Sequence, residues 1–463
     1  MDERFTTRSP IDGQVYLERT YANATQVEQT LASAVAGQRA MRALSVQERM
    51  GLCAALVDAM LAQRASLAEE LTWQMGRPSA HAASEFRGFE ERARRMIELA
   101  EGALADTPQP PREGFQRWIR REPLGVVLVL SPWNFPYLTS VNVVIPALLA
   151  GNAVVLKHAE QTPLCAERYA AAARQAGLPE GALQFLHLTH RQVANVIRDG
   201  RVAQVAFTGS VQGGRAVAQA AAPGFVGAGL ELGGKDPAYV CEDADLDFAA
   251  TELADGALFN AGQSCCGIER IYVHQAVYDK FVERLVGTVQ GYVLGDPREA
   301  TTTLGPLARV QGAEQVNKQV RAALAAGATG CIDPSRYGAT KLGVNYVAPQ
   351  VLVDVTHDMA VMREETFGPV VGVMRVPDDA SALALMNDSV YGLTASIWTA
   401  DLERAARLGD EVQTGTVFAN RCDYLDPDLP WTGVKDSGLG CTLSALGFGQ
   451  LTRPKSFHLR SQR

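Results

Sequence analysis

Short runs of β-branched and aliphatic residues that alternate with helical stretches constrain the fold of this 463-residue chain more than any other feature. Near-continuous apolar strands are typical of a parallel sheet whose two faces are both covered by helices. The first block predicts strands at residues 125–130, 153–157, 202–208 and 228–233, with a helix at residues 163–176. The sequence therefore predicts an α/β domain built on a parallel sheet.

A second block of alternation occupies residues 237–420 and predicts a second α/β domain after the first. Its strands are expected at residues 268–274, 369–376 and 414–420, where apolar residues gather. At a prior of about 150 residues per domain, a chain of this length holds two or three domains. Domains of that size bury enough surface to be stable without disulfides or a structural metal.

The segments that flank these blocks have a different pattern. Three helices are expected before them, at residues 24–44, 46–74 and 84–105, because apolar residues recur there at spacings of three and four. The proline-rich segment that follows Pro108 alternates like an exposed two-stranded piece, and residues 453–460 alternate in the same way. We therefore expect these two segments to pair outside the main cores.

The charge balance excludes several classes of protein. Lysine and arginine number 43 against 51 aspartates and glutamates, so the formal net charge is −8, and no basic run suited to nucleic acid occurs. No apolar run approaches the roughly 18 residues that a membrane helix requires. The polar N-terminal segment lacks the apolar core of a secretory signal. We expect a cytoplasmic protein that binds neither nucleic acid nor membrane.

The eight cysteines and seven histidines give no sign of a metal centre. No C-x-x-C pair occurs, and His187 and His190 have no further ligand nearby in the sequence, so a surface pair is the favoured interpretation. Cysteines in a reducing compartment are expected to stay free. Because Cys265 and Cys266 form the one local concentration, cysteine chemistry is sought there.

Three motifs carry residues suited to catalysis. Small residues surround Cys265 in FNAGQSCC and leave room for a substrate, although a lone cysteine is more often a buried hydrophobe. Glu231 ends a predicted strand in ELGGK, at the sheet edge where ligands bind, and is either a general base or an inert solvated carboxylate. Asn134 in PWNFP has a side-chain amide that suits an oxyanion, although an asparagine in a proline-bounded turn more often serves the turn itself.

The motif FTGS, at residues 207–210, ends another predicted strand ahead of a helix. The N-terminus of that helix is suited to an anionic phosphate. The dinucleotide fingerprint G-x-G-x-x-G is absent from the sequence, so spacing alone gives this interpretation weak support.

Taken together, the motifs resemble those of the aldehyde dehydrogenase superfamily over nearly the whole chain. Seven motifs occur in the family's order and at close to its spacings: PWNFP (132–136), KHAEQTP (157–163), FTGS (207–210), ELGGK (231–235), GQSC (262–265), EETFGPV (364–370) and PWTGVKDSG (430–438). Several motifs in one order are far more specific than any of them alone.

The resemblance implies two Rossmann-like α/β domains, one that binds NAD and one that is catalytic, together with a small β oligomerisation arm. The expected boundaries are 1–106 and 124–235 for the NAD-binding domain, 236–435 for the catalytic domain, 107–123 and 452–463 for the arm and tail strand, and 436–451 for a segment that returns to the NAD-binding domain. Family members are homodimers or homotetramers, so we expect a homo-oligomer in which a shared strand covers sheet edges.

The resemblance also implies a mechanism. Cys265 would be the nucleophile that attacks the aldehyde carbon, with Cys266 only its neighbour. The side-chain amide of Asn134 and the backbone N–H of Cys265 would hold the oxyanion of the thiohemiacetal. After hydride transfer to the nicotinamide, Glu231 would activate the water that hydrolyses the thioester to the carboxylic acid.

Nine positions match the family's cofactor contacts: Trp133, Lys157, Glu160, Gly209, Ser210, Leu232, Gly233, Glu365 and Phe367. In the family, Lys157 and Glu160 correspond to residues at the adenosine ribose. A carboxylate accepts hydrogen bonds from a ribose diol and repels a 2′-phosphate, so Glu160 predicts a preference for NAD over NADP. NADP use stays open because Lys157 and His158 are nearby.

Two departures from the family pattern affect the site. Thr442 stands where many members have the glutamate of a proton relay, which leaves Glu231 as the one strong candidate base. Trp431 stands where phenylalanine is common, so the substrate tunnel is expected to be aromatic but differently shaped.

The tunnel is expected to be lined by Tyr137, Phe259, Arg421 and Trp431, which favours a medium-sized aliphatic or aromatic aldehyde. In the loop at residues 420–431, Arg421 could instead clamp the acid of a semialdehyde, and three aspartates could attract an amino-aldehyde. These are Asp423, Asp426 and Asp428. Loop contacts and caps are the commoner use of such charges.

Two rival functions keep the fold. A coenzyme A-acylating enzyme would release the thioester to a thiol, but such relatives generally lack the base that this chain has at Glu231. An inactive NAD-binding scaffold would have lost the catalytic residues, whereas Cys265, Glu231 and Asn134 are all present. Hydrolytic oxidation of an aldehyde is therefore the favoured function.

Overall fold

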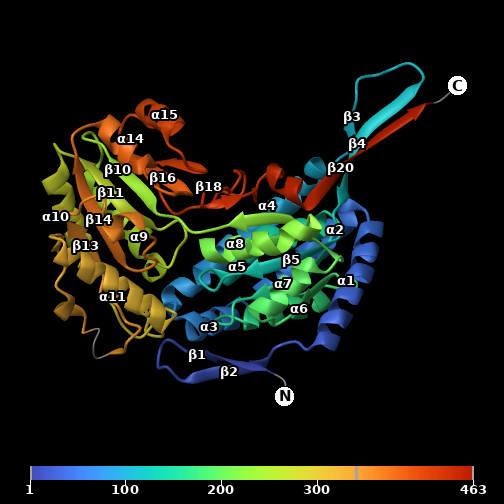
Figure 1. The fold of residues 1–463 in the computed structure, drawn as a ribbon, viewed down its shortest axis with the longest axis horizontal. Helices are drawn as coiled ribbons and strands as arrows, with labels where there is room; N and C mark the ends of the chain where they lie inside the picture. The colour runs from blue at the N-terminus through green and yellow to red at the C-terminus, as the bar shows by residue number, and fades with distance from the viewer. Residues whose placement is uncertain (1–2, 339–341, 461–463) are drawn as a thin grey trace.

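The computed structural model describes residues 3–338 and 342–460 and has two α/β units and a projecting β arm (Figure 1). Each unit is built on a mainly parallel sheet with helices packed against it. This is the α/β fold class that the alternating pattern predicted.

The N-terminal segment begins with an antiparallel hairpin of β1 (Arg4–Arg8) and β2 (Val15–Thr20), which the sequence pattern did not reveal. Four helices follow: α1 (Ala24–Ala43), α2 (Val46–Leu61), α3 (Arg64–Met75) and α4 (Ser79–Leu104). Capping boxes at Asn23 and Ser45 fix where α1 and α2 begin, since each side chain satisfies a backbone N–H that the helix leaves free.

The single helix expected at residues 46–74 is wrong, because the chain bends by 65° between α2 and α3. The bend keeps the apolar faces of both helices on one core, where Leu56 and Met60 of α2 join Leu67 and Leu71 of α3. Helix α3 then ends at Gly76, whose left-handed conformation (φ 81°) favours glycine.

The first sheet has six strands in the order β19-β9-β8-β5-β6-β7. Its strands are β5 (Val126–Ser131), β6 (Ala153–His158), β7 (Leu183–Phe185), β8 (Val202–Thr208), β9 (Gly227–Glu231) and β19 (Gly438–Leu439), the last antiparallel to β9. Its helices are α5 (Pro136–Leu149), α6 (Leu164–Gln175), α7 (His190–Arg198) and α8 (Val211–Ala221). All four strands predicted for this block are present.

The second sheet has seven strands in the order β12-β13-β14-β11-β10-β16-β17. They are β10 (Asp236–Val240), β11 (Ile268–His274), β12 (Thr329–Gly330), β13 (Gln350–Val353), β14 (Val370–Val376), β16 (Thr394–Trp398) and β17 (Thr416–Ala419). Its helices are α9 (Leu246–Leu258), α10 (Tyr278–Val289), α11 (Val310–Ala325), α13 (Ala360–Arg363), α14 (Asp379–Asn387) and α15 (Leu402–Glu411).

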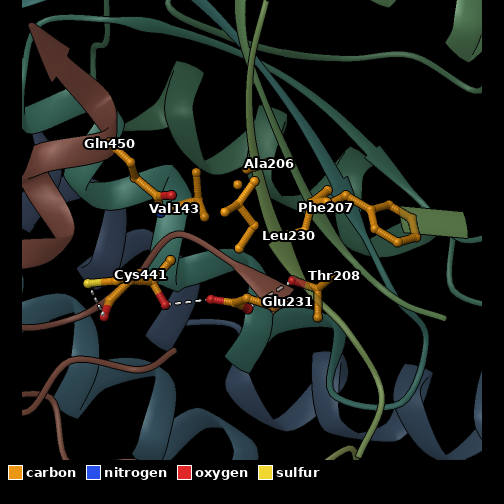
Figure 2. Close-up of a pocket in the computed structure, with 11 residues that line it drawn as sticks. Val143, Ala206, Phe207, Thr208, Leu230, Glu231, Cys441 and Gln450 are labelled. Atoms are coloured by element: carbon orange, nitrogen blue, oxygen red, sulfur yellow. Dashed lines mark hydrogen bonds between the residues drawn. The ribbon is translucent and has the colours of Figure 1, made fainter. Parts of the chain in front are cut away.

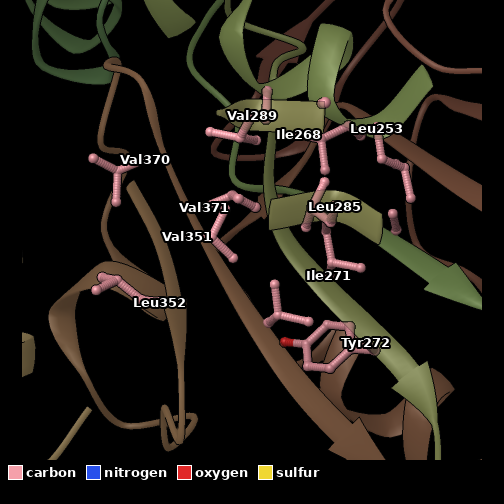
Figure 3. Packing of buried hydrophobic residues seen from close by; sticks show 14 of the residues in the cluster. Leu253, Ile268, Ile271, Tyr272, Leu285, Val289, Val351, Leu352, Val370 and Val371 are labelled. Carbon is pink, nitrogen blue, oxygen red and sulfur yellow. The ribbon is translucent and has the colours of Figure 1, made fainter. Parts of the chain in front are cut away.

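The core of this second unit lies where strand side chains meet those of the covering helices. Ile271 of β11 and Val371 of β14 pack there with Leu253 of α9 and Leu285 of α10, and all four side chains are fully or almost fully buried (Figure 3). A core of this kind fixes the amino ends of β10, β11 and β14, and Lys235, Cys265 and Glu365 lie just ahead of these ends.

The β arm is formed by the Pro-rich segment and the C-terminal tail. Strand β20 (Thr452–Arg460) runs antiparallel to β4 (Phe115–Pro123) along its whole length, and β3 (Thr107–Pro108) adds a short edge. Trp118 stacks on Phe457 across the pair, with ring centroids 4.5 Å apart. The expected pairing of the tail with the Pro-rich segment is confirmed, and the arm projects from the body of the molecule (Figure 1).

In the described part of the chain, no single helix has both the length and the hydropathy for crossing a membrane. The bent pair α2 and α3 passes that test only when its two members are taken together.

Candidate active site

A cleft of about 570 Å³ opens at the carboxyl ends of β5, β6 and β8. Four of the residues expected to contact a cofactor line it: Trp133, Lys157, Gly209 and Ser210. Ser210 caps α8, since its hydroxyl accepts a hydrogen bond from the N–H of Gly213 at 3.2 Å. The next N–H groups of α8 face this end, so the cleft offers a helix N-terminus to an anion.

One cation that lines this cleft was not predicted from the sequence: Arg309, the residue directly before α11. Its guanidinium lies over the ring of Trp133, with 5.6 Å to the ring centroid. Glu160 does not line the cleft directly, because Tyr21 donates a hydrogen bond to its Oε1 at 2.6 Å. Burial lowers the pKa of both Lys157 and Arg309, and the carboxylate of Glu160 opposes this in each case.

The two glycines of ELGGK lie where three segments meet. A Cβ at Gly233 would collide with the carboxylate of Glu365, and a Cβ at Gly234 would collide with the carbonyl oxygen of Cys265. The N–H of Gly234 donates to Glu365 Oε1 at 3.1 Å. Burial raises the pKa of Glu365 to about 7, with the neighbouring Glu269 second among the causes. The close approach of the Cys265 backbone to this motif therefore requires glycine at position 234.

Lys235 and Glu269 form a buried ion pair that sequence reasoning missed, with 2.6 Å between Nζ and Oε2. The carboxylate of Glu269 also accepts the backbone N–H groups of Thr366 at 2.8 Å and Phe367 at 2.9 Å. These bonds hold Phe367 at φ 52°, a region that non-glycine residues seldom adopt. The rings of Phe367 and Trp133 are nearly perpendicular, with centroids 5.7 Å apart, so Phe367 packs against a residue that lines the cleft.

The loop that carries the candidate nucleophile begins with three successive residues of positive φ: Asn260 (53°), Ala261 (57°) and Gly262 (70°). Strain of this kind persists only where surrounding contacts enforce it. The side-chain amide of Asn260 supplies such contacts, because its Nδ2 donates to the carbonyl oxygens of Asn134 and Gln263, each at 3.2 Å. The loop therefore has one fixed path ahead of Cys265.

The two adjacent cysteines lie in different environments. Cys265 is half-buried, whereas Cys266 is 4% exposed and its Sγ donates to Asp423 Oδ1 at 2.9 Å. The contact with Cys265, followed by burial, raises the pKa of Cys266 well above its usual range. Cys266 is thus held as a thiol away from solvent, and Cys265 is the one of the two that a substrate can reach.

Asn134 reaches the same loop through its side chain. Its Nδ2 donates to the carbonyl oxygen of Gln263 at 3.1 Å, which leaves a second N–H of the amide for another acceptor. The backbone carbonyl of Asn134 accepts a hydrogen bond from Arg77, whose guanidinium is buried and paired with Glu85. Glu85 in turn accepts the N–H groups of Tyr137 and Leu138 in the first turn of α5, at 2.7 and 3.0 Å.

Glu231, at the carboxyl end of β9, is held by two threonine hydroxyls. Thr208 donates to Oε2 at 3.0 Å, and Thr442 donates to Oε1 at 2.5 Å (Figure 2). Burial raises the pKa of Glu231, while these two hydroxyls and the charge of Arg92 oppose the increase. The three residues also line a narrow pocket of about 10 Å³, which is on the scale of one water molecule.

The four residues expected in a substrate tunnel are dispersed. Tyr137 lies in the core and not in a tunnel wall, because its ring is fully buried against Phe86 and Tyr169. Arg421 is exposed and stacks on Tyr424 at 3.5 Å from the ring centroid, so it lies at the surface and not inside.

Phe259 is half-buried, and Trp431 is 5% exposed. Phe259 stacks on Phe135, a partner that the sequence analysis missed, with ring centroids 6.3 Å apart. Trp431 is in the same apolar cluster as Cys266, and two backbone hydrogen bonds of 2.8 and 2.9 Å join it to Thr442. Leu232, one of the expected cofactor contacts, is buried against Gly214 of α8 instead of lining the cleft.

No group of three or more histidine, cysteine, aspartate or glutamate side chains within residues 3–338 and 342–460 is arranged to hold a metal ion. The fold and the site together define a two-sheet α/β oxidoreductase with a nucleotide-sized cleft, a half-buried cysteine and a half-buried carboxylate. Residues 1–457 match the model of the aldehyde dehydrogenase family, and the chain belongs to that family.

The relatives agree with this assignment. Succinate-semialdehyde dehydrogenase [NADP(+)] 1 of Mycobacterium tuberculosis (strain ATCC 25618 / H37Rv) is 36% identical over 454 residues, which cover 97% of this chain and 98% of the relative. The crystal structure of succinic semialdehyde dehydrogenase from Streptococcus pyogenes in complex with NADP+ is 30% identical, with a TM-score of 0.93, and covers 98% of this chain and 100% of that one. Betaine aldehyde dehydrogenase from Staphylococcus aureus in complex with NAD+ is 27% identical, with a TM-score of 0.94, and covers 100% of this chain and 92% of that one.

Proposed function

We propose that this aldehyde dehydrogenase oxidises its aldehyde through a covalent intermediate on Cys265 and releases a carboxylic acid. The observation that carries the proposal is the convergence of three segments on one accessible thiol. Gly234 of ELGGK packs on the carbonyl oxygen of Cys265, and Asn134 of PWNFP donates to the adjoining Gln263. Attack of the thiolate on the aldehyde carbon forms the C–S bond and a thiohemiacetal oxyanion.

Two donors are available for that oxyanion. The free N–H of the Asn134 amide and the backbone N–H of Cys265 border the thiol, and donors fixed before the reaction stabilise charge that develops during it. Loss of hydride from the thiohemiacetal carbon leaves a thioester on Cys265. Glu231 then takes a proton from water, whose oxygen attacks the thioester, and the thiolate leaves as the acid forms.

The cleft fits a nicotinamide dinucleotide, which when bound accepts the hydride. The N-terminus of α8 suits its pyrophosphate, Lys157 suits the adenosine ribose, and Glu365 and Phe367 suit the nicotinamide end. We propose NAD as the preferred cofactor, because Glu160 adds a negative charge beside Lys157.

NADP is the second candidate, and one arrangement favours it. Tyr21 holds the carboxylate of Glu160, while the cations Lys157 and Arg309 line the cleft, as a 2′-phosphate would require. The mycobacterial relative is an NADP(+) enzyme by name, and the streptococcal structure contains NADP+ as the cofactor, which supports this alternative. The ratio of kcat/KM for NAD to that for NADP decides between them, and a ratio below one would overturn the NAD preference.

The test of the proposed function is the formation of NADH from an aldehyde in the absence of coenzyme A. Hydrolytic oxidation yields NADH and the acid with water alone, whereas an acylating enzyme would stall after one turnover. A protein that binds NAD normally but produces no NADH from a broad panel of aldehydes would instead be a scaffold.

We further propose that the arm joins subunits of a homodimer or homotetramer. Most side chains of β20 are exposed. The strand pairs with β4 along one edge and lies at the end of its sheet, so its other edge can pair with a strand of a second subunit. Light scattering measures the mass, and a monomer at micromolar concentration would contradict the proposal.

A further inference from the structure

Arg92 is a buried cation beside the candidate nucleophile. It lies in the middle of α4 and is 6% exposed. Its helix neighbours Phe89, Ala93 and Met96 belong to the apolar cluster that contains Cys266 and against which Cys265 packs. A buried charge is costly unless it is paired, so its position needs a reason.

The protein itself pairs this charge only in part. Arg92 Nη1 donates to the carbonyl oxygen of Leu138 at 2.8 Å and to Asn142 Oδ1 at 3.3 Å, and both acceptors are neutral groups of α5. Within the described residues, no carboxylate lies within ion-pair distance of Arg92, and Nε and Nη2 make no hydrogen bond. Two donors of the planar guanidinium therefore stay available to a further acceptor.

The charge of Arg92 acts on the groups of the active site. Burial raises the pKa of Glu231, and it raises the pKa of Asp423 to about 7, and the guanidinium opposes both increases. No ion pair joins Asp423 to Arg92, and Asp423 Oδ1 instead accepts hydrogen bonds from Cys266 at 2.9 Å and from Ser264 at 3.3 Å. The charge of Arg92 thus interacts electrostatically with Glu231 and with Asp423, whose side chain contacts the loop of Cys265.

A loop covers α4 at the position of Arg92. Tyr424 donates its hydroxyl to Glu91 Oε1 at 2.8 Å, and Arg95 Nε pairs with Asp428 at 2.5 Å. The loop at residues 421–431 is therefore fastened on both sides of Arg92 along the helix. Arg92 lies where α4, α5 and this loop meet, while Arg421 of the same loop stays at the surface.

We propose that Arg92 binds the carboxylate of an aldehyde substrate that carries an acid at its far end, which makes the preferred substrate a short ω-carboxy aldehyde. A carboxylate supplies two acceptors in the geometry of the available guanidinium donors and neutralises the buried charge. A neutral aldehyde leaves Arg92 unpaired, and an amino-aldehyde is repelled by it. Two relatives are named as dehydrogenases of succinate semialdehyde, which is an aldehyde of this class. The proposal rests on the chemistry of Cys265 given above.

The test compares succinic semialdehyde with butanal, which has the same number of carbons but no acid. Arg92→Met removes the charge and keeps a long side chain, and Arg92→Lys keeps a charge without the planar fork. Arg94→Met is the matched control, because Arg94 lies on the same helix but is exposed and paired with Asp58 and Glu90. Each enzyme is assayed by the release of NADH with saturating NAD and, separately, by the release of NADPH with saturating NADP.

We expect the wild-type enzyme to have a higher kcat/KM for succinic semialdehyde than for butanal. Arg92→Met lowers kcat/KM for succinic semialdehyde by about 30-fold or more, mainly through KM, since a desolvated charge pair is lost. It changes the value for butanal by less than about threefold, Arg92→Lys recovers part of the loss, and Arg94→Met leaves the ratio of the two substrates unchanged.

Three outcomes overturn the proposal. The first is a wild-type enzyme with a higher kcat/KM for butanal. The second is an equal fall in kcat/KM for both aldehydes in Arg92→Met. The third is that Arg421→Met, and not Arg92→Met, abolishes the preference for the acid-bearing aldehyde. The butanal assay separates this proposal from the proposed function. NADH or NADPH formed from butanal alone refutes only the role of Arg92, whereas no reduced cofactor from either aldehyde, with NAD or with NADP, refutes the oxidation itself.

Discussion

The hydroxyl of Thr442 donates to the Oε1 of Glu231 at 2.5 Å, across 211 residues of sequence. Many members of the family have a glutamate at this position, and a second carboxylate there would raise the pKa of Glu231 by repulsion. The threonine does the opposite, because a donor stabilises the charged carboxylate. Backbone hydrogen bonds also join Trp431 to Thr442. The position of the loop at residues 421–431 is therefore coupled to that of the hydroxyl that contacts Glu231.

Removing this donor should change the pH dependence of the reaction. In Thr442→Val the carboxylate of Glu231 loses a hydrogen bond, so its pKa rises further above the usual value. The base is then protonated up to a higher pH, and the acid limb of the kcat profile moves to higher pH. Steady-state kinetics across the acid limb measures this shift.

Thr442→Ser is the control, because it keeps the hydroxyl and removes only a methyl group. Its acid limb should coincide with that of the wild-type enzyme. A Thr442→Val profile that also coincides with the wild type would show that the hydroxyl does not tune the base.

The two cysteines should differ in their response to alanine. Cys265→Ala removes the nucleophile, and oxidation should fall by about 10⁴-fold or more, as it does when the nucleophile of a covalent catalyst is deleted. Cys266→Ala removes only a buried thiol that is bonded to Asp423, so at least about half of kcat should remain. NADH release from a common aldehyde measures both, and equal losses would contradict the assignment of Cys265.

The strands were predictable where apolar, β-branched residues run without interruption, as in β5 and the first four residues of β6. Strand β10 was missed because its sequence DPAYV begins with a charge and a proline, which usually mark a turn. Its Asp236 is tolerated because the carboxylate accepts the N–H of Thr394 at 3.1 Å and its hydroxyl at 2.5 Å. Such compensation comes from a distant strand and leaves no local signal.

The motifs likewise indicated the residue types of the site but not their partners. Arg92 lies in the run ERARR, which on a helix usually indicates a solvated face. Only the packing of α4 on α5 turns one of these arginines inward, towards Leu138 and Asn142, while Arg94 and Arg95 stay partly exposed. The inward cation was therefore invisible to a pattern of charges along the chain.

Glu231→Gln should separate acylation from hydrolysis. The amide has nearly the shape of the carboxylate and can still meet Thr208, but it cannot take a proton from water. The thioester on Cys265 should therefore persist, and kcat should fall by about 100-fold or more. Mass spectrometry of the enzyme mixed with aldehyde and NAD measures the acyl adduct, and rapid turnover without an adduct would contradict the role of Glu231.

The ion pair of Arg77 and Glu85 should be the most costly pair in this region to break. Both side chains are almost completely buried, and Arg77 also donates to Asn134 O and to Asn260 Oδ1. Arg77→Met leaves a buried carboxylate without its cation, so the free energy of unfolding should fall by about 3–5 kcal/mol.

The exposed pair of Arg94 and Glu90 provides the comparison, since Arg94→Met should lower the free energy of unfolding by less than about 1 kcal/mol. Denaturant unfolding followed by fluorescence measures both variants. Because Arg77 also fixes the carbonyl of Asn134, the residual folded Arg77→Met enzyme should lose kcat more than it raises KM. A variant of wild-type stability and wild-type kcat would show that this buried pair neither supports the fold nor positions the oxyanion donor.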